Sequence, residues 1–140
     1  MTFRLFAILL IVVFFNNFWL AQNEASKWYF ANGGGLDFMS SPPTVLNNGS
    51  ITAFNGSSCI SDAAGNLLFY AGINYYDLGF STNVYNSLHQ QMPNGDSLKG
   101  VAWYNELTIV PMPSNANKFY LFTLDVNFDI GLYYSIIDMN

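Results

Sequence analysis

After residue 21, the chain offers almost no place for an α-helix. Its apolar residues do not recur at helical spacing, and Gly or Asn interrupts nearly every window of helix length. Short runs rich in aromatic and β-branched residues alternate instead with turn-forming residues. This pattern predicts an all-β fold.

The clearest strand signal is the stretch Cys59–Gly72. Within it, Asp62–Asn66 has the composition of a tight turn, and Leu67–Ala71 is an apolar and aromatic run typical of a strand. Asp accepts backbone N–H bonds in such turns, and Gly or Asn takes the left-handed position. We therefore predict a β-hairpin here, with Cys59 as a small core residue rather than a nucleophile.

Further strands are expected along the rest of the chain. In order, they are Lys27–Ala31, Leu36–Phe38, Thr44–Leu46, Ile51–Phe54, Asn83–Asn86, Leu107–Met112, Lys118–Leu124 and Leu132–Ile137. The segment Ile73–Phe80 is expected to be irregular, because Gly72 and Gly79 interrupt any regular period.

Two of the strand signals suggest a repeat. Leu68–Tyr70 and Phe119–Phe122 begin about fifty residues apart, close to the roughly 40 to 50 residues of one four-stranded propeller blade. A closed propeller needs at least about four blades, which is more than this chain can supply. We therefore predict a partial β-propeller of about two blades, with residues 22–140 as the N-terminal fragment of a longer domain. The alternative is a complete small β-sandwich, and an exposed apolar edge at Leu132–Ile137 counts against it.

Residues 1–21 have the features of a secretory signal peptide. A short region with Arg4 precedes the apolar run Leu5–Phe15, which is too short for a comfortable membrane span. We predict a signal helix, cleavage after Ala21 and no membrane span in the mature chain. The alternative is an uncleaved N-terminal anchor.

Charge disfavours two classes of partner, nucleic acid and an anionic membrane surface. The chain has 4 basic and 9 acidic residues, and only 9% of its residues are charged. It has no Lys or Arg cluster that would neutralise nucleic-acid phosphates or an anionic membrane. With 18% aromatic residues, it remains compatible with protein, carbohydrate or calcium as a partner. A single Cys excludes an intrachain disulfide, and a single His makes a Cys–His or Ser–His–Asp catalytic set improbable.

The acidic stretch Asp125, Asn127 and Asp129 resembles the alternating oxygen ligands that open a calcium loop. Ile130 stands where an EF-hand needs Gly, and Ile136 stands where it needs a bidentate Glu, so an EF-hand is excluded. A looser calcium site in a hairpin loop remains as an alternative to an ordinary polar turn. No other cofactor is predicted.

Two further sets of residues are candidates for carbohydrate chemistry. Exposed aromatic side chains stack on sugar rings, and the candidates for such a surface are Tyr75, Tyr76, Trp103 and Tyr104. For a glycosidase, the candidate carboxylate pair is Asp77 and Glu106, although nothing in the sequence fixes their separation.

Several phrases, taken together in this order, are similar to one family. They are Trp28-Tyr29-Phe30, Gly35-Leu36-Asp37-Phe38, Ile60-Ser61-Asp62, Gly65-Asn66-Leu67-Leu68-Phe69-Tyr70, Val84-Tyr85-Asn86, His89-Gln90, Met92-Pro93-Asn94-Gly95, Ile109-Val110-Pro111, Tyr120-Leu121-Phe122-Thr123 and Gly131-Leu132-Tyr133-Tyr134-Ser135. The chain resembles the N-terminal propeller-like region of large exported proteins from gliding and related bacteria.

The chain departs from this family at three points. The segment between Gly72 and Val84 is longer and richer in Tyr than the family's usual short turn, and Tyr85 stands where the family commonly has Trp. The segment Val101–Glu106 lacks the usual Ser-Thr-Gln-Ser run. These departures concern local loop structure.

Many members of that family carry immunoglobulin-like repeats and a C-terminal sorting domain for type IX secretion. The resemblance implies a secreted or cell-surface, non-catalytic structural or interaction module, associated with adhesion or motility. It implies protein or carbohydrate at the cell surface as the partner, and it carries over no catalytic residues. The alternatives from other classes are a carbohydrate-active enzyme and a calcium-dependent carbohydrate-binding domain.

Overall fold

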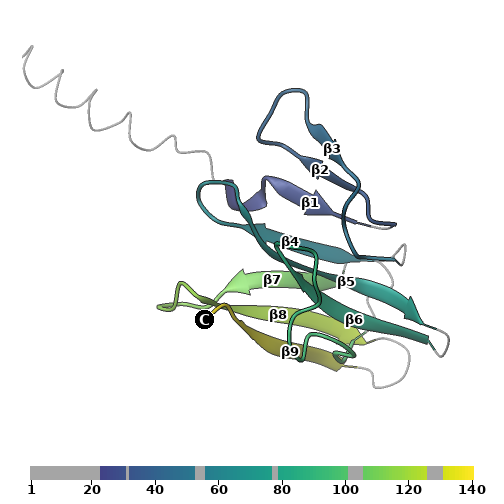
Figure 1. Cartoon of the computed structure of the whole chain (residues 1–140). Coiled ribbons are helices and arrows are strands. Elements are labelled where there is room, and N and C mark those ends of the chain that lie inside the picture. The colour runs from purple at the N-terminus through teal and green to yellow at the C-terminus, as the bar shows by residue number, and fades with distance from the viewer. Residues whose placement is uncertain (1–22, 31, 53–55, 77–78, 101–105, 126–130) are drawn as a thin grey trace, which may run out of the picture.

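The structure, a computed structural model, describes residues 23–30, 32–52, 56–76, 79–100, 106–125 and 131–140. These residues form three antiparallel sheets of three strands each (Figure 1). The strands are β1 (Lys27–Tyr29), β2 (Gly35–Asp37), β3 (Thr44–Leu46), β4 (Ser57–Ser61), β5 (Leu67–Tyr76), β6 (Gly79–Asn86), β7 (Leu107–Pro111), β8 (Lys118–Asp125) and β9 (Gly131–Asp138). The all-β prediction is confirmed for the described residues, whose one helical turn is the 3-10 segment η2 (Asn23–Ala25). The predicted signal peptide, residues 1–21, lies outside them.

Each sheet consists of three consecutive strands in sequential order. The predicted hairpin at Cys59–Gly72 is confirmed as β4 and the first part of β5, with Cys59 opposite Tyr70. β8 is the central strand of the last sheet and pairs over its whole length with β9, from Lys118 opposite Asp138 to Asp125 opposite Gly131.

The predicted irregular segment at Ile73–Phe80 is wrong. β5 continues to Tyr76 and pairs with β6 from Gly79 onward, so that Ile73 lies opposite Thr82. Gly72 lies within the strand, and its lack of a side chain lets Ile51 approach the backbone closely. A Cβ at this position would collide with the side chain of Ile51. Glycine is therefore needed here for packing rather than for a turn.

The strand predicted at Ile51–Phe54 is also wrong in its described part. Ile51 and Thr52 lie outside any strand, and Ile51 is apolar because it is buried against β5. Its carbonyl accepts a hydrogen bond from the Gly33 N–H (3.0 Å), and the Thr52 N–H donates to Asn74 Oδ1 (3.0 Å). Residues 53–55 lie outside the described part of the chain.

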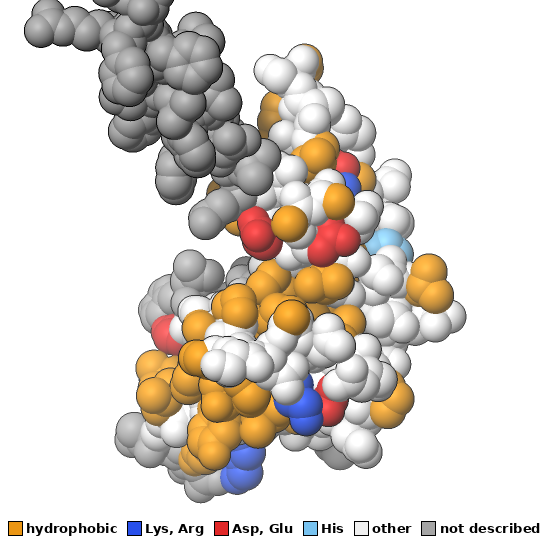
Figure 2. Space-filling view, turned by 90° about the vertical axis from the view of Figure 1, so that its left-hand side faces the viewer, with side chains coloured by type: hydrophobic (Ala, Val, Ile, Leu, Met, Phe, Trp, Pro, Cys, Tyr) orange, Lys and Arg blue, Asp and Glu red, His pale blue; other side chains and the backbone are white. Residues whose placement is uncertain are grey.

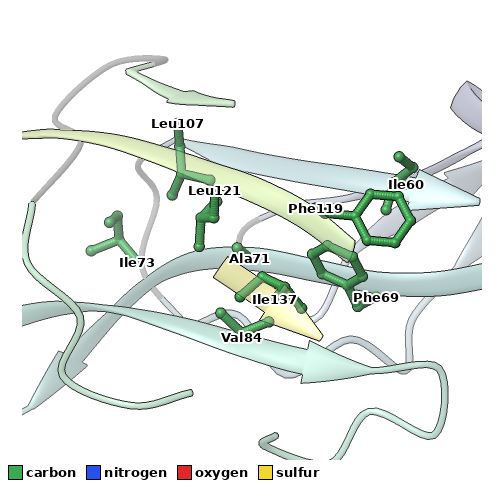
Figure 3. Packing of buried hydrophobic residues seen from close by; sticks show 9 residues of the cluster. All are labelled: Ile60, Phe69, Ala71, Ile73, Val84, Leu107, Phe119, Leu121 and Ile137. Atoms are coloured by element: carbon green, nitrogen blue, oxygen red, sulfur yellow. The ribbon is translucent and has the colours of Figure 1, made fainter. Parts of the chain in front are cut away.

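The sheets stack face to face through two apolar clusters, and β5 contributes to both. Between β1–β3 and β4–β6, the buried side chains are Tyr29, Ile51, Tyr70 and Tyr85. Between β4–β6 and β7–β9, they are Ile60, Phe69, Ala71, Ile73, Val84, Leu107, Phe119, Leu121 and Ile137 (Figure 3). The molecule thus has three layers of sheet, and the alternative of a two-sheet sandwich does not describe it.

The first strands of the three sheets lie side by side in a row. β4 lies against β1 on one side and against β7 on the other (Figure 1). Since β1, β4 and β7 are each an edge strand of their sheet, the third strands β3, β6 and β9 lie at the opposite edges.

The outer edge of β6 is covered by residues 90–98, which we call the covering segment. The N–H of Val84 donates to the Gly95 carbonyl (2.7 Å), and the N–H of Met92 donates to the Val84 carbonyl (2.9 Å). The N–H of Leu98 likewise donates to the Thr82 carbonyl (3.1 Å). The covering segment therefore stands in the position of an irregular fourth strand of the middle sheet.

Candidate interaction surfaces

The face of the β7–β9 sheet that points away from the core is apolar. Along β8, buried side chains alternate with partly exposed ones, and the second set opposes the exposed side chains of β9 in register. We define the β7–β9 outer face as Val110, Tyr120, Phe122, Leu124, Leu132, Tyr134 and Ile136. Leu132 is 70% exposed and Tyr134 is 64% exposed. Both faces of this sheet are therefore mainly apolar, with Lys118 and Asp138 paired at one end of the outer face.

Aromatic rings pave the middle of the β7–β9 outer face. The ring of Tyr134 lies 5.9 Å from that of Tyr120 and 6.4 Å from that of Phe122, measured between centroids. Figure 2 shows hydrophobic side chains gathered in the lower half of the molecule, at the height of β7–β9 in Figure 1. Contiguous apolar surface of this kind marks an interaction site in a soluble protein.

The opposite end of the stack carries a second apolar face. Trp28, Leu36 and Val45 lie opposite one another across β1, β2 and β3, on the side away from the buried Tyr29. Val45 is 75% exposed, and the ring of Phe38 packs 4.9 Å from that of Trp28. We define the β1–β3 outer face as Trp28, Leu36, Phe38 and Val45. Both ends of the three-sheet stack are therefore apolar.

A polar network joins the first two sheets around His89. The Tyr29 hydroxyl donates to Asn48 Oδ1 (3.2 Å), and Asn48 Nδ2 donates to His89 Nε2 (2.8 Å). Because an amide nitrogen donates only, Nε2 must accept, so the neutral ring carries its proton on Nδ1, which faces the Tyr70 hydroxyl (3.2 Å). The Ser50 N–H also donates to that hydroxyl (2.9 Å).

The network favours neutral groups. Burial lowers the pKa of His89, and burial raises the pKa values of Tyr29 and Tyr70. The His89 carbonyl accepts a further hydrogen bond from Ser50 Oγ (2.8 Å). His89 therefore fastens the loop after β3 to the loop after β6, which is a structural role.

Cys59 is a partly buried residue at this same junction, which agrees with its predicted packing role. The Tyr29 N–H donates to its sulfur (3.0 Å), and burial raises the pKa of the thiol to about 11. The thiol is therefore protonated at neutral pH and is a poor nucleophile.

Asp62 forms the predicted turn of the β4–β5 hairpin. Its Oδ1 accepts hydrogen bonds from the N–H groups of Ala64 (2.9 Å) and Asn66 (2.8 Å), and its Oδ2 accepts one from Asn66 Nδ2 (3.0 Å). Gly65 has a φ of +85°, the left-handed conformation that the turn requires. The hydrogen bonds from Asn66 are the main cause that lowers the pKa of the Asp62 carboxyl.

The predicted calcium ligands are described in part. Asp125 lies at the end of β8 and is buried, whereas Asn127 and Asp129 fall outside the described residues. Within the described part of the chain, no group of three or more His, Cys, Asp or Glu side chains is placed to hold a metal ion. The calcium site stays a prediction.

The predicted aromatic surface and the carboxylate pair are also described in part. Tyr75 is 63% exposed on β5, and Tyr76 follows it in the strand, but the side chain of Tyr76 is not described. Trp103 and Tyr104 lie outside the described residues, as does Asp77. Glu106 is partly buried just before β7. Both sets therefore stay predictions.

Two grooves lined by described residues lie beside the sheets. One, of about 480 Å³, runs between the covering segment and β9 and is lined by Met92, Leu98, Ile136 and Met139 among others. The second, of about 320 Å³, lies between β1 and β4, with Trp28 and Phe30 on its wall and Cys59 beside them. Both grooves are partly apolar and open to solvent.

The β1–β3 outer face is not predicted from the sequence, and the β7–β9 outer face is predicted only as an exposed apolar edge at Leu132–Ile137. A further signal for the β7–β9 outer face is present on β8. The run Phe119-Tyr120-Leu121-Phe122 is apolar at every position, whereas a strand with one solvated face alternates between apolar and polar residues. Such a continuous run indicates a strand that is covered on both faces.

The chain matches no family model, and no similar protein is found among curated proteins or solved structures. In the described part of the chain, there is no helix long and apolar enough to cross a membrane.

Proposed function

We propose that the chain is a non-catalytic interaction module of an exported cell-surface or extracellular protein, whose three sheets are consecutive blades of a propeller-like domain. The observation that carries this proposal is the repeated arrangement of the sheets. The same three-strand meander occurs three times, each stacks on the next, and the first strands β1, β4 and β7 adjoin.

The propeller reading has three supports. In propellers, blades of antiparallel strands are arranged around a central axis. The line of β1, β4 and β7 fits the inner strands of such blades, and the covering segment fits an irregular fourth strand of the middle blade. The end faces of the stack are apolar, as the faces of blades between neighbours are.

The interaction role follows from the surface. The exposed aromatic side chain of Tyr75, which belongs to neither end face, together with a chain of which only 9% of residues are charged, suits contact with protein or carbohydrate better than contact with polyanions. The polar clusters at His89, Cys59 and Asp62 are engaged in holding loops and turns together. We therefore propose that the module binds a partner at the cell surface in adhesion or motility.

Binding and hydrolysis measured on the same sample test this proposal. The full chain is incubated with purified envelope polysaccharide and with intact cells, and both the bound fraction and the release of reducing sugar are followed. We expect saturable binding without sugar release, and Tyr75→Ala should weaken the binding more than the control Leu88→Ala, which removes a side chain of similar exposure from a loop.

The same assay separates the alternatives. Release of sugar by the chain would establish a carbohydrate-active enzyme and overturn the non-catalytic reading. Binding that disappears with a calcium chelator and returns with calcium would identify the calcium-dependent binding domain instead. If the chain bound neither intact cells nor polysaccharide, the surface-module proposal would be wrong.

A further inference from the structure

We infer that the β1–β3 outer face of one copy of this chain packs against the β7–β9 outer face of a second copy, so that two chains close a ring of six sheets. This inference rests on the proposed blade arrangement. It identifies a partner for the two apolar faces, which the described part of the chain leaves exposed.

The first argument is the internal repetition of the packing. We call the face that a sheet turns toward the preceding sheet of the chain its leading face, and the face that it turns toward the following sheet its trailing face. Within the chain, the trailing face of each sheet packs on the leading face of the next. Tyr29 contacts Tyr70 in the first junction, and Phe69 contacts Phe119 in the second. The β1–β3 outer face is a leading face and the β7–β9 outer face is a trailing face. A head-to-tail contact between copies would therefore repeat the junction that the chain already forms twice.

The second argument is the chemistry of the faces. Neither defined face contains a charged side chain, and both carry aromatic rings beside branched aliphatic residues. The charges next to the β7–β9 outer face are Lys118 and Asp138, which pair with each other (2.8 Å). Burial of these faces would leave no unpaired charge among the named side chains, which is the condition for a stable apolar interface.

The third argument is geometric. Strands of three residues make the β1–β3 outer face only about 10 Å long, so a single contact of this kind is too small for a stable dimer. In a closed pair, both contacts form together, and the second one is intramolecular once the first has formed. Two copies of three sheets give 2 × 3 = 6, within the roughly four to eight blades of closed propellers.

The mass of the full chain in solution is the first test. Sedimentation equilibrium over a range of concentrations should give a dimer of the 15.7 kDa chain, with no larger assemblies. Val45→Asp and Tyr134→Asp each place a carboxylate in both contacts of the ring, and each should weaken dimerisation at least a hundredfold. Both positions are exposed within one chain, so the variants are expected to fold, which circular dichroism checks.

A matched control distinguishes the faces from general surface change. Leu88 is 71% exposed in the loop after β6 and belongs to neither face, so Leu88→Asp should remain dimeric. Loss of the dimer in Leu88→Asp to the same extent as in Tyr134→Asp would overturn the assignment of the interface.

The single variants and their mixture test the head-to-tail arrangement. A Val45→Asp chain keeps its trailing face and a Tyr134→Asp chain keeps its leading face, but a mixed pair has only one intact contact, which is too small for a stable dimer. Each variant alone and the equimolar mixture should therefore all be monomeric. If two β7–β9 outer faces paired with each other instead, Val45→Asp alone would stay dimeric, which contradicts the inference. A native chain that is monomeric at all concentrations would also overturn it, while surface binding by such a monomer would leave the proposed function standing.

Discussion

At the residue scale, some buried polar side chains stabilise the fold through hydrogen bonds, whereas one lacks a partner and lowers the stability of the fold. His89, Tyr70 and Asn48 satisfy one another across the first junction. Ser61 is the contrasting case: it is almost completely buried in β4, and its hydroxyl has no hydrogen-bond partner among the described residues. A buried hydroxyl without a partner destabilises the fold.

Ser61→Ala should therefore raise the free energy of unfolding, by about 1 kcal/mol, because it removes a desolvated hydroxyl without opening a large cavity. The measurement is urea unfolding followed by circular dichroism. Ser58→Ala on the same strand is the matched control and should lower stability by about 1 kcal/mol, since Ser58 Oγ accepts a hydrogen bond from the Ile109 N–H (3.2 Å). Destabilisation by both variants would contradict the assignment.

His89 should make stability depend on pH. Burial lowers its pKa in the folded state, so the unfolded chain binds the proton more readily. Stability is then complete above the unfolded value of about 6.5, falls as the pH drops through that value toward the lowered folded value, and levels off below it. The neighbouring Tyr29 and Tyr70 hydroxyls stay neutral in this range.

Unfolding curves between pH 8 and pH 5 measure this effect. The variant His89→Gln keeps hydrogen-bonding groups but cannot titrate, so its stability should be flat between pH 7 and pH 5.5. An equal fall in stability for both proteins would assign the effect to other groups.

At the element scale, the β4–β5 hairpin is specified by its turn. Asp62 fixes the chain through the N–H groups of Ala64 and Asn66, and Gly65 takes the left-handed conformation. A side chain at position 65 would also meet the Met39 sulfur, at 2.5 Å from an added Cβ. Both effects oppose substitution.

Gly65→Ala should destabilise the fold by about 1 to 2 kcal/mol, the cost of a left-handed conformation for a residue with a Cβ. Gly65→Asn adds the same Cβ contact but tolerates the conformation better, so it should cost less. Thermal unfolding of the two variants measures the difference. Equal losses would assign the whole effect to the Met39 contact.

The hairpin and most strands could be predicted because their signals are local. Asp62 and its turn partners lie within five residues of one another, and the all-β reading needs only the apolar spacing. The role of Gly72 could not be predicted, because it depends on Ile51, a residue distant in the sequence. The partners of His89 lie 19 and 41 residues away, so its site was equally out of reach.

At the scale of the whole molecule, β5 couples the two cores. Phe69 and Tyr70 are neighbours in sequence, both are completely buried, and their side chains enter different clusters. The last two sheets share nine buried apolar residues (Figure 3). Disruption of one core should therefore destabilise all three sheets.

Phe69→Ala should lower the free energy of unfolding by about 3 to 5 kcal/mol, the usual cost of removing a buried Phe side chain. The transition should remain single, with far-UV and near-UV circular dichroism changing together. The exposed-site control Leu88→Ala should change stability by less than about 0.5 kcal/mol. Two separate transitions in the native chain would show that the cores unfold independently.

The consecutive order of the strands also bears on how the chain acquires its structure. Within each sheet, every strand pairs only with a strand adjacent to it in the sequence. These strand pairings therefore have low contact order and form quickly. The strands of a sheet can begin to pair as soon as the third strand has left the ribosome, before the next sheet has been made. Assembly can then proceed vectorially from the N-terminal sheet, with each completed sheet serving as the template on which the following one condenses.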